Sequence, residues 1–340
     1  MDVVTKIAAD IGTKRLRFAD IDSDILIDEP ALAALDEEGR AVAVGARAEK
    51  LLNDLPGKYI AAYPIKNGRI EDAELLEICV EKIMKKLKKS YLRMLLPKVF
   101  LCVRSGMTDI QKNELRAVLG TSASRDVEFI PEAIAASYGA EENADGTETV
   151  LSVCLGAGSA EAVVVCMGSV AESTELSASG TYINDEIASR IRRTLCIWAG
   201  KGSVEKLKKD IGAECHENEH TLICAKNIMT GLPVFANIDH SMIRDTVREC
   251  LTKAADEIKR MLSSLPGELY SDVMKKEMLI SGGGAEMPGV AEFFENALGM
   301  KVRVTDEPRL CAVKGIKSLI GERYIKTGYF RAPANDISVE

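Results

Sequence analysis

The pattern of apolar and polar residues over positions 4–21 predicts a hairpin, and a similar pattern returns near the middle of the chain. The runs "VTKIAAD" and "RLRFADI", the second with alternating apolar positions, indicate two strands joined by a turn at Gly12-Thr13-Lys14. The stretch "TVLSVCLGAGSAEAVVVCM" again places two strand-like runs around a small turn, Gly156-Ala157-Gly158. A hairpin with a glycine turn therefore opens each half of the chain. This weak internal repeat indicates a duplicated, two-lobed fold.

Several segments between and after these hairpins have helical spacing. From Glu71 to Lys89 the apolar residues Leu75, Cys79, Ile83 and Leu87 would share one helix face. The segment 241–265 has the most regular amphipathic pattern in the chain. We also expect helices at 109–119, after Pro131, at 183–198, at 203–211 and in "RLCAVKGIKSLIGERY", with strands at "KVFLCV", "DVEFI" and "EMLIS".

Composition adds limits on the class of protein. A chain of 340 residues is too long for one ordinary core, and 46 % hydrophobic with 28 % charged residues is typical of a soluble globular protein. The net charge of −8 carries no nucleic-acid signature, so we expect no nucleic-acid partner. Nine cysteines without a CxxC pair indicate a reducing compartment. The N-terminus leads straight into a strand pattern, and no apolar run approaches the roughly 20 residues that span a bilayer. We therefore expect a cytoplasmic protein.

Three glycine turns are candidates for phosphate binding, because glycine lets backbone amides approach an anion closely. The third is Gly282-Gly283-Gly284 in "LISGGGAEMPG". A glycine turn taken alone more often only connects two strands than binds a ligand. Neither "GAGSAE" nor "GGGAEM" has the third glycine of the dinucleotide fingerprint, and the chain has no G-K-[ST] of a Walker loop. Both common nucleotide folds, and a nicotinamide oxidoreductase with them, are disfavoured.

The segment "DIGTKRLRFAD" resembles the first phosphate motif of the actin and sugar-kinase ATPase superfamily, specifically that of the MreB-type bacterial actins of rod-shape determination. Further segments follow in that family's order: "VGARAEKLLNDLPGKYIAAYPIKNGRIED", "VRSGMTDIQKNELR", "IPEAIAASYGA", "VEKLKKDIG", "IMTGLPVFANI", "PGELYSDVMKKEMLISGGG" and "VTDEP". The resemblance covers about residues 4–325. It implies an α/β, actin-like two-lobed fold of duplicated ribonuclease-H-like domains, each a mixed five-stranded sheet with helices, around a nucleotide cleft.

The resemblance also implies domain boundaries. The first lobe would span 1–147, with a small subdomain at about 30–70, and the second lobe 148–308, with a small subdomain at about 184–240. The C-terminal helix 309–325 would pack back on the first lobe, and 326–340 would form a mobile tail.

The same resemblance places ATP or ADP, with Mg²⁺, in the cleft. Asp10 matches the aspartate that holds Mg²⁺ through water, and Glu132 matches the acid that orients the attacking water. Their ordinary interpretations are a turn acid and a carboxylate in the first turn of a helix. Lys14 would pair with phosphate or point to solvent, while Glu205 and Lys208 would contact ribose and adenine or form a surface ion pair. The full set of nucleotide-binding candidates is Gly12, Thr13, Lys14, Gly156, Ala157, Gly158, Gly180, Glu205, Lys208, Gly282, Gly283 and Gly284.

Several residues depart from the family pattern. Cys154 stands in place of the second motif's aspartate, and Thr181 and Asn184 stand at acidic positions. A neutral thiol cannot hold the water shell of a hard cation. Pro131 precedes the acid at Glu132 instead of following it, which changes the expected position of the water. We therefore predict a weak or absent ATPase, with nucleotide binding retained through backbone amides.

Two further segments have competing interpretations. The apolar residues after the basic run "KIMKKLKK" occupy the loop that inserts into the membrane in related proteins, or else they begin a buried strand. The set Cys215, His216, His220 and Cys224 does not match the pair spacings of structural zinc sites, so a solvated strand is favoured there. The residues of the membrane-loop candidate are Leu92, Met94, Leu95 and Leu96.

The leading functional hypothesis is a nucleotide-binding bacterial actin that forms membrane-associated filaments in cell-shape determination. Its implied partners are other copies of itself, paralogous bacterial actins, membrane cell-shape proteins and the membrane surface, at the inner face of the cell membrane. One alternative is a degenerate scaffold that does not hydrolyse ATP and regulates a paralogous filament. A second alternative is a small-molecule kinase of the same superfamily, for which the cleft offers no obvious substrate base.

Overall fold

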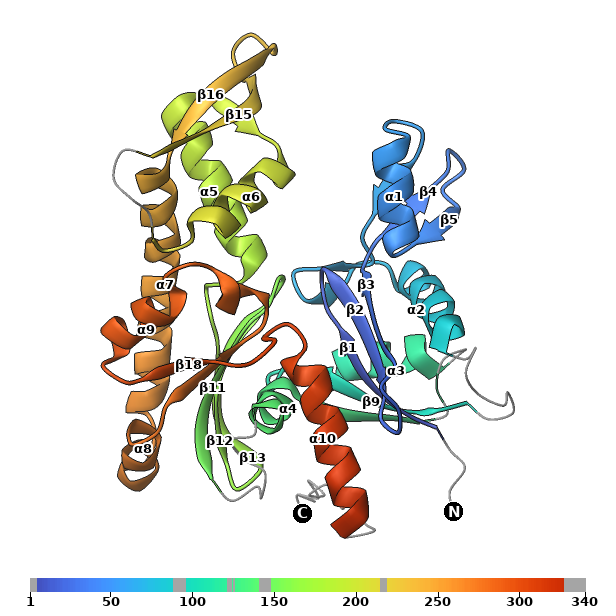
Figure 1. Cartoon of the computed structure of the whole chain (residues 1–340), viewed down its shortest axis with the longest axis vertical. Coiled ribbons are helices and arrows are strands. Elements are labelled where there is room, and N and C mark those ends of the chain that lie inside the picture. Colours follow the sequence, from blue (N-terminus) through green and yellow to red (C-terminus); the bar gives the residue numbers. More distant parts are fainter. Residues whose placement is uncertain are drawn as a thin grey trace, which may run out of the picture.

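The chain folds into two lobes, each built around a five-stranded sheet (Figure 1). The computed structural model describes residues 5–87, 96–120, 124, 126–140, 148–214 and 219–326. The first sheet has the strand order β10-β9-β1-β2-β3, and the second has the order β13-β12-β11-β17-β18. In each sheet three antiparallel strands are extended by two parallel ones. The predicted α/β fold of two mixed five-stranded sheets is therefore confirmed, and the shared topology accounts for the repeat in the sequence.

The elements of the first lobe are β1 (Lys6–Ile11), β2 (Arg15–Asp20), β3 (Leu26–Pro30), β4 (Ala33–Leu35), β5 (Ala41–Val44), α1 (Ala46–Asp54), β6 (Ile60–Ala62), β7 (Ile65–Lys66), β8 (Arg69–Ile70), α2 (Ala73–Leu87), β9 (Lys98–Val103), α3 (Asp109–Gly120), β10 (Asp126–Pro131), α4 (Glu132–Gly139) and the returning α10 (Cys311–Lys326). Those of the second are β11 (Thr149–Leu155), β12 (Ala160–Cys166), β13 (Ser169–Glu175), α5 (Gly180–Leu195), β14 (Ile197–Ala199), α6 (Lys201–Ile211), β15 (His220–Asn227), β16 (Pro233–Asp239), α7 (His240–Ser263), α8 (Gly267–Met274), β17 (Met278–Ser281), the 3₁₀ turn η2 (Gly283–Glu286), α9 (Val290–Leu298) and β18 (Val302–Val304).

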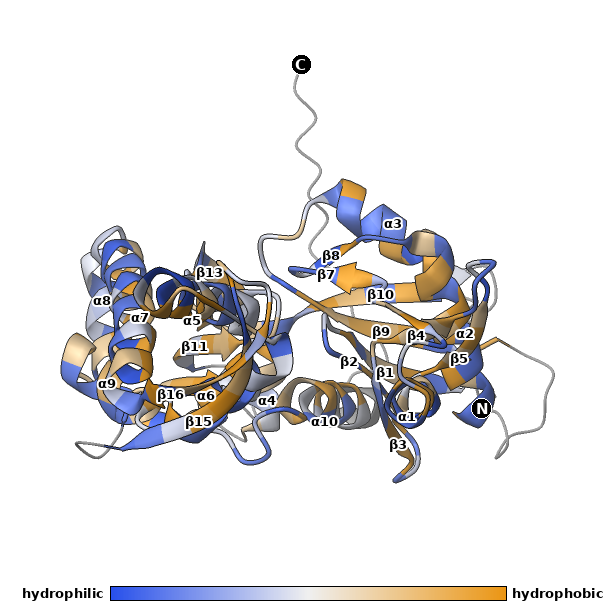
Figure 2. Cartoon of the chain, turned by 90° about the horizontal axis from the view of Figure 1, so that it is seen from above, coloured by the Kyte–Doolittle hydropathy of each residue, from blue (hydrophilic) through white to orange (hydrophobic). Residues whose placement is uncertain are grey.

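The second sheet is covered on both faces, which explains the nearly continuous apolar runs of β11 and β12. Leu151 and Val153 join the core formed with α5 and α7, whereas Val163 and Val165 pack on Ala133 of α4. The view from above shows the apolar strands inside and the polar faces of the helices outside (Figure 2).

Helices α4 and α10 pack side by side between the lobes, almost backbone against backbone (Figures 1 and 2). A Cβ atom added to Gly315 would lie 1.7 Å from the carbonyl oxygen of Ala135, and one added to Gly139 would lie 2.3 Å from that of Cys311. Ile316 and Val313 of α10 join the core beneath β1 and β9. The last described helix of the chain thus docks on the first lobe and fixes α4, whose first residue is Glu132.

Most helices lie where the apolar spacing predicts them, including α2 and α7. The predicted bounds of the helix at 183–198 are wrong at both ends, because α5 spans Gly180–Leu195. Ser179 caps its first turn by accepting a hydrogen bond from the amide of Tyr182, and Cys196 ends it in the left-handed conformation at φ 53°. Residues 197–199 form β14 instead.

Parts of three sequence predictions lie outside the described residues: Leu92, Met94 and Leu95 of the membrane loop, Cys215 and His216 of the zinc alternative, and residues 327–340 of the tail. Leu96 is exposed, and His220 and Cys224 lie on β15. In the described part of the chain, no group of three or more side chains is placed to hold a metal ion, and no helix is long and apolar enough to cross a membrane.

Candidate nucleotide site

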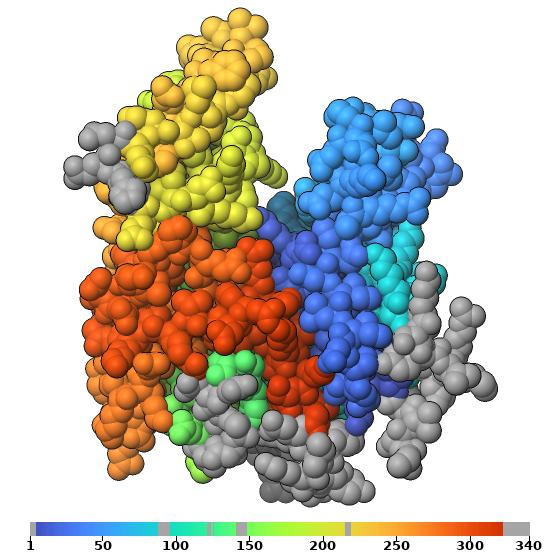
Figure 3. Space-filling model, viewed as in Figure 1, coloured from blue at the N-terminus to red at the C-terminus, as the bar shows by residue number. Residues whose placement is uncertain are grey.

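The turns of the two glycine hairpins meet in the hollow between the lobes (Figure 3). A Cβ atom on Gly158, in the β11–β12 turn, would lie 2.0 Å from Oγ1 of Thr13, in the β1–β2 turn, and 2.6 Å from the amide nitrogen of Gly68. That amide of Gly68 donates a 2.9 Å hydrogen bond to Thr13 Oγ1. Only glycine at position 158 allows this approach, so the two predicted phosphate turns are brought together face to face.

Both turns keep backbone amides for an anion. Across the residues for which the structure gives contacts, no protein acceptor hydrogen-bonds the amides of Thr13, Lys14, Ala157 and Gly158. Thr13, Ala157 and Gly158 are half-buried and Lys14 is exposed, so these amides can pair with water or with an anion. Successive free amides of this kind form an anion-binding nest.

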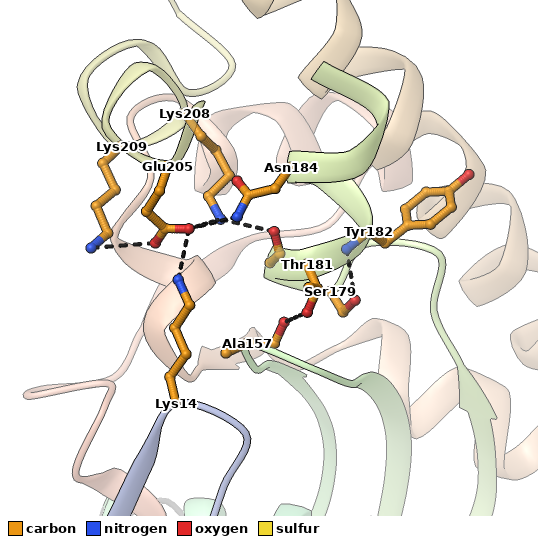
Figure 4. Close-up of polar contacts among 10 residues, drawn as sticks. Lys14, Ala157, Ser179, Thr181, Tyr182, Asn184, Glu205, Lys208 and Lys209 are labelled. Atoms are coloured by element: carbon orange, nitrogen blue, oxygen red, sulfur yellow. Dashed lines mark hydrogen bonds and ion pairs between the residues drawn. The ribbon is translucent and has the colours of Figure 1, made fainter. Parts of the chain in front are cut away.

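The N-terminus of α5, by contrast, is already occupied by the β11–β12 turn (Figure 4). The amides of Gly180 and Thr181 donate to the carbonyl oxygens of Gly156 and Ala157, at 2.9 and 2.7 Å. The hydroxyl of Thr181 donates to Ala157 as well. These bonds fix the orientation of the β11–β12 turn relative to α5.

Lys14 reaches across the cleft from the first lobe to the second (Figure 4). Its Nζ lies 2.7 Å from Oε2 of Glu205 on α6, so Lys14 does not point only to solvent. The same carboxylate accepts a hydrogen bond from Asn184 at 2.6 Å and pairs with Lys208 at 3.2 Å. Partial burial opposes its ionisation, but these hydrogen bonds and the charge of Lys208 hold the pKa of Glu205 well below its usual range. Lys208 is buried, so the Glu205–Lys208 pair is not a surface ion pair.

At the floor of the cleft, Asp10 is paired with an arginine. Nη1 of Arg17 donates to Oδ2 of Asp10 at 2.8 Å, from the directly opposite position on β2. Burial raises the pKa of Asp10, and the charge of Arg17 opposes that rise. The carboxylate predicted to serve a metal ion therefore already has a cation beside it.

Two further carboxyl groups at this floor have raised pKa values. Burial, followed by the charges of Asp10 and Glu161, raises the pKa of Glu132 to about 8. Burial raises the pKa of Glu161 to about 7, although the amide of Ser105 donates to its Oε2 at 2.9 Å. Oε1 of Glu161 is buried and has no hydrogen-bond partner among the described residues. A Glu132 that is protonated at neutral pH is a poor acceptor for the proton of an attacking water.

Cys154 lies on β11 and packs against Ala136 of α4 and Cys311 of α10. The thiol is buried, burial raises its pKa well above the usual value, and Ser281 Oγ lies 3.1 Å from its sulfur. A buried neutral thiol supplies no charge to a metal ion. Its cross-strand neighbour is Glu161, so the two hairpins share one arrangement, with Asp10 opposite Arg17 and Cys154 opposite Glu161.

The three glycines of the triple-glycine turn differ in the space around them. A Cβ on Gly282, which has φ +83°, would lie 2.6 Å from the carbonyl oxygen of Leu155, and one on Gly284 would lie 2.7 Å from the Leu155 side chain. These two glycines are needed for packing against the end of β11. Gly283 has open space around it, with the side chain of Arg309 3.9 Å away, and is the member of the turn best placed to face a ligand.

The raised pKa of Glu132 gives a testable pH dependence. The folded chain keeps the proton of Glu132 up to about pH 8, whereas an unfolded chain releases it near its ordinary value of 4.5, so stability falls as pH rises through this window. Glu132→Gln should remove that loss, and its stability relative to the parent chain should grow between pH 5 and 8 by at most about 1.4 kcal/mol per pH unit. Urea denaturation at several pH values measures this. Glu172→Gln, at an exposed glutamate of β13, is the control and should leave the pH profile unchanged. A constant difference between Glu132→Gln and the parent chain would show that Glu132 ionises normally.

Comparison with known proteins identifies the family of this chain. A family model described as MreB/Mbl protein matches residues 4–326. The chain belongs to the MreB/Mbl family. The cell shape-determining protein Mbl of Bacillus subtilis is 25 % identical over 312 residues, which cover 91 % of this chain and 93 % of Mbl. The cell shape-determining protein MreB of Escherichia coli is 25 % identical over 316 residues, which cover 91 % of each chain.

Solved structures agree with this family at the level of the fold. MreB5 of Spiroplasma citri bound to AMPPNP matches with a TM-score of 0.85 and 23 % identity, over 97 % of this chain and 100 % of MreB5. A chain of the MamK double helical filament matches with a TM-score of 0.74 and 15 % identity, over 93 % of this chain and 99 % of MamK. The fold is therefore the actin-like fold of this family.

The residues at the floor of the cleft fit a hydrated Mg²⁺ poorly. Such an ion keeps several waters and is held by one or two carboxylates together with phosphates. Asp10 is paired with Arg17, and the opposite hairpin presents the neutral Cys154. Thr181 and Asn184 are engaged with Ala157 and Glu205.

Sequence reasoning missed Arg17, Glu161 and the partner of Lys14. The first two could have been found, because each follows its cross-strand neighbour by the same seven-residue spacing around a short turn.

Proposed function

We propose that this chain is a nucleotide-binding bacterial actin of cell-shape determination that forms filaments in the cytoplasm, at the inner face of the cell membrane, and hydrolyses ATP slowly or not at all. The observation that carries the proposal is the pair of facing turns whose amides are left for an anion, in a chain of the MreB/Mbl family. MreB5 has been solved bound to AMPPNP and to ADP, which supports either nucleotide here.

The nucleotide would enter between the lobes with its phosphates at the two turns. Gly12, Thr13, Lys14 and the Gly156–Gly158 turn would surround the phosphates from opposite lobes. Glu205 and Lys208 lie on the α6 side, where a ribose hydroxyl would compete with Lys14 for the Glu205 carboxylate. Gly283 would lie beneath the base. Mg²⁺ at Asp10 would lie beside the guanidinium of Arg17.

Slow hydrolysis is expected from the raised pKa of Glu132 and from the thiol at position 154. Phosphoryl transfer depends on positioning the nucleophile and neutralising charge, with little covalent chemistry left to the protein. Glu132 would have to accept a proton from water, and its raised pKa leaves it mostly protonated at neutral pH. In the second lobe Cys154 supplies no carboxylate, and burial raises the pKa of its cross-strand neighbour Glu161 to about 7.

Self-association is supported by an exposed apolar face on the outer sheet of the second lobe. The outward residues of this β14-β15-β16 sheet and its connecting loop are Trp198, Leu222, Phe235, Met229 and Leu232, each at least 61 % exposed. Monomeric proteins rarely leave contiguous apolar surface of this kind uncovered. We propose that a second copy of the chain covers it, as MamK forms a double helical filament.

Sedimentation with ATP, with ADP and without nucleotide tests this function, with a parallel arm containing anionic lipid vesicles. We expect nucleotide-dependent pelleting, further co-sedimentation with the vesicles through the 92–96 segment, and little released phosphate. Phe235→Asp should reduce pelleting, whereas Ile110→Asp, at an equally exposed site on α3, should not. Pelleting that ignores nucleotide would favour the alternative of a regulatory scaffold. The absence of both nucleotide binding and filaments would overturn the proposal.

A further inference from the structure

Arg17 is fixed at the floor of the cleft by two carboxylates. Its Nη1 lies 2.8 Å from Asp10 Oδ2, its Nε lies 3.3 Å from Asp28 Oδ1, and only 11 % of its side chain is exposed. Asp10 Oδ1 in turn lies 3.7 Å from the position that a Cβ on Gly12 would take. The guanidinium is therefore held beside Asp10, the carboxylate nearest the β1–β2 turn.

A divalent cation that neutralises phosphate charge would be expected beside Asp10, the carboxylate nearest the β1–β2 turn. The guanidinium of Arg17 lies beside this carboxylate. A guanidinium is charged at every pH at which the protein is folded, and its five donors suit phosphate oxygens. Nη1 of Arg17 donates one hydrogen to Asp10, and Nε faces Asp28. The remaining N–H donors of the guanidinium are left for a phosphate. A metal ion at Asp10 would meet a fixed positive charge, and the opposite hairpin presents the buried thiol of Cys154 beside Glu161, whose pKa burial raises to about 7.

We propose that Arg17 replaces the divalent cation in this chain, so that nucleoside di- and triphosphates bind independently of Mg²⁺. The inference rests on the nucleotide site proposed above and assigns its counter-charge. Lys14, which reaches the same cleft, adds a second positive charge from the same hairpin. Arg17 thus acts as a built-in counter-ion that cannot be removed by chelation.

The test is equilibrium binding of ATP and ADP to the full chain, by titration calorimetry, in Mg²⁺ and in EDTA. For the parent chain we expect dissociation constants that agree within about threefold between the two buffers. Arg17→Gln should weaken binding in EDTA by about tenfold or more, as expected for a lost charge-assisted contact. Part of this loss should return in Mg²⁺, because Asp10 is then free to hold the ion.

The matched control is Arg15→Gln. Arg15 lies two positions away on the same strand and pairs with the same Asp28 at 2.7 Å, but the structure shows no contact between it and Asp10. Like the parent chain, this variant should bind ATP and ADP with similar dissociation constants in Mg²⁺ and in EDTA. If the parent chain itself binds at least about tenfold more weakly in EDTA, Arg17 is not the counter-ion, although the nucleotide site stands. That comparison does not depend on any variant folding. If neither buffer supports binding, the nucleotide site and this inference both fail.

Discussion

Gly315→Ala is expected to destabilise the chain by at least about 2 kcal/mol, because overpacking a tight interface costs about 1–3 kcal/mol and sometimes more. The new methyl group would lie 1.7 Å from the carbonyl oxygen of Ala135, a backbone atom that cannot move without displacing α4. Thermal or urea unfolding measures the effect. Since α4 begins at Glu132, we also expect the variant to lose nucleotide affinity.

Gly321→Ala is the control, because it lies in the same helix with open space around it. Alanine is favoured over glycine in a helix by up to about 1 kcal/mol, so this variant should be slightly more stable than the parent chain. If both variants gain stability, α10 does not pack on α4 as described.

Gly158→Ala should reduce affinity for ATP and ADP by about tenfold or more, which corresponds to about 1.4 kcal/mol or more. Its Cβ would collide with Thr13 Oγ1 and the Gly68 amide, so the two turns must separate. Amides aligned on one anion from both lobes would then no longer reach it together. Fluorescent-nucleotide displacement measures the change.

Gly106→Ala serves as the control for this variant, because it sits in a turn of the first lobe with nothing within 4 Å of the added carbon. It should bind nucleotide like the parent chain. Unchanged affinity in Gly158→Ala, with a normal melting curve, would mean that the facing turns are not the phosphate site.

The regular parts of this fold could be predicted from hydrophobic spacing alone. Helix α7 follows directly from a period of 3.6 residues, because it buries one continuous face. The β1–β2 hairpin follows from two strand-like runs around a glycine turn, although both of its faces are buried, with Ile7 and Phe18 in one core and Ala8 and Ala19 in another. The boundaries of α5 could not, since they depend on a side-chain cap at Ser179 and a left-handed residue at Cys196. Such ends are set by local hydrogen bonds and leave no periodic signal.

The site was only partly predictable. Glycine turns and the resemblance pointed to the cleft, and the structure brings two of the three turns into contact. The pairing of Lys14 with Glu205 joins residues from different lobes, so it depends on how the lobes close. The interpretation of Cys154 as a lost metal ligand stays a prediction. The structure adds the pairing of Asp10 with Arg17, which the seven-residue spacing between them could have revealed.

A single-turnover experiment tests most directly whether this cleft binds ATP without cleaving it. The full chain is mixed in excess with labelled ATP, and bound ATP and ADP are separated after increasing times, with and without Mg²⁺. We expect ATP to be retained intact in both buffers, because burial and the charges of Asp10 and Glu161 raise the pKa of Glu132, and Arg17 is paired with Asp10. Rapid conversion to ADP that requires Mg²⁺ would overturn this view of the site and show that the cleft works as an ordinary metal-dependent ATPase.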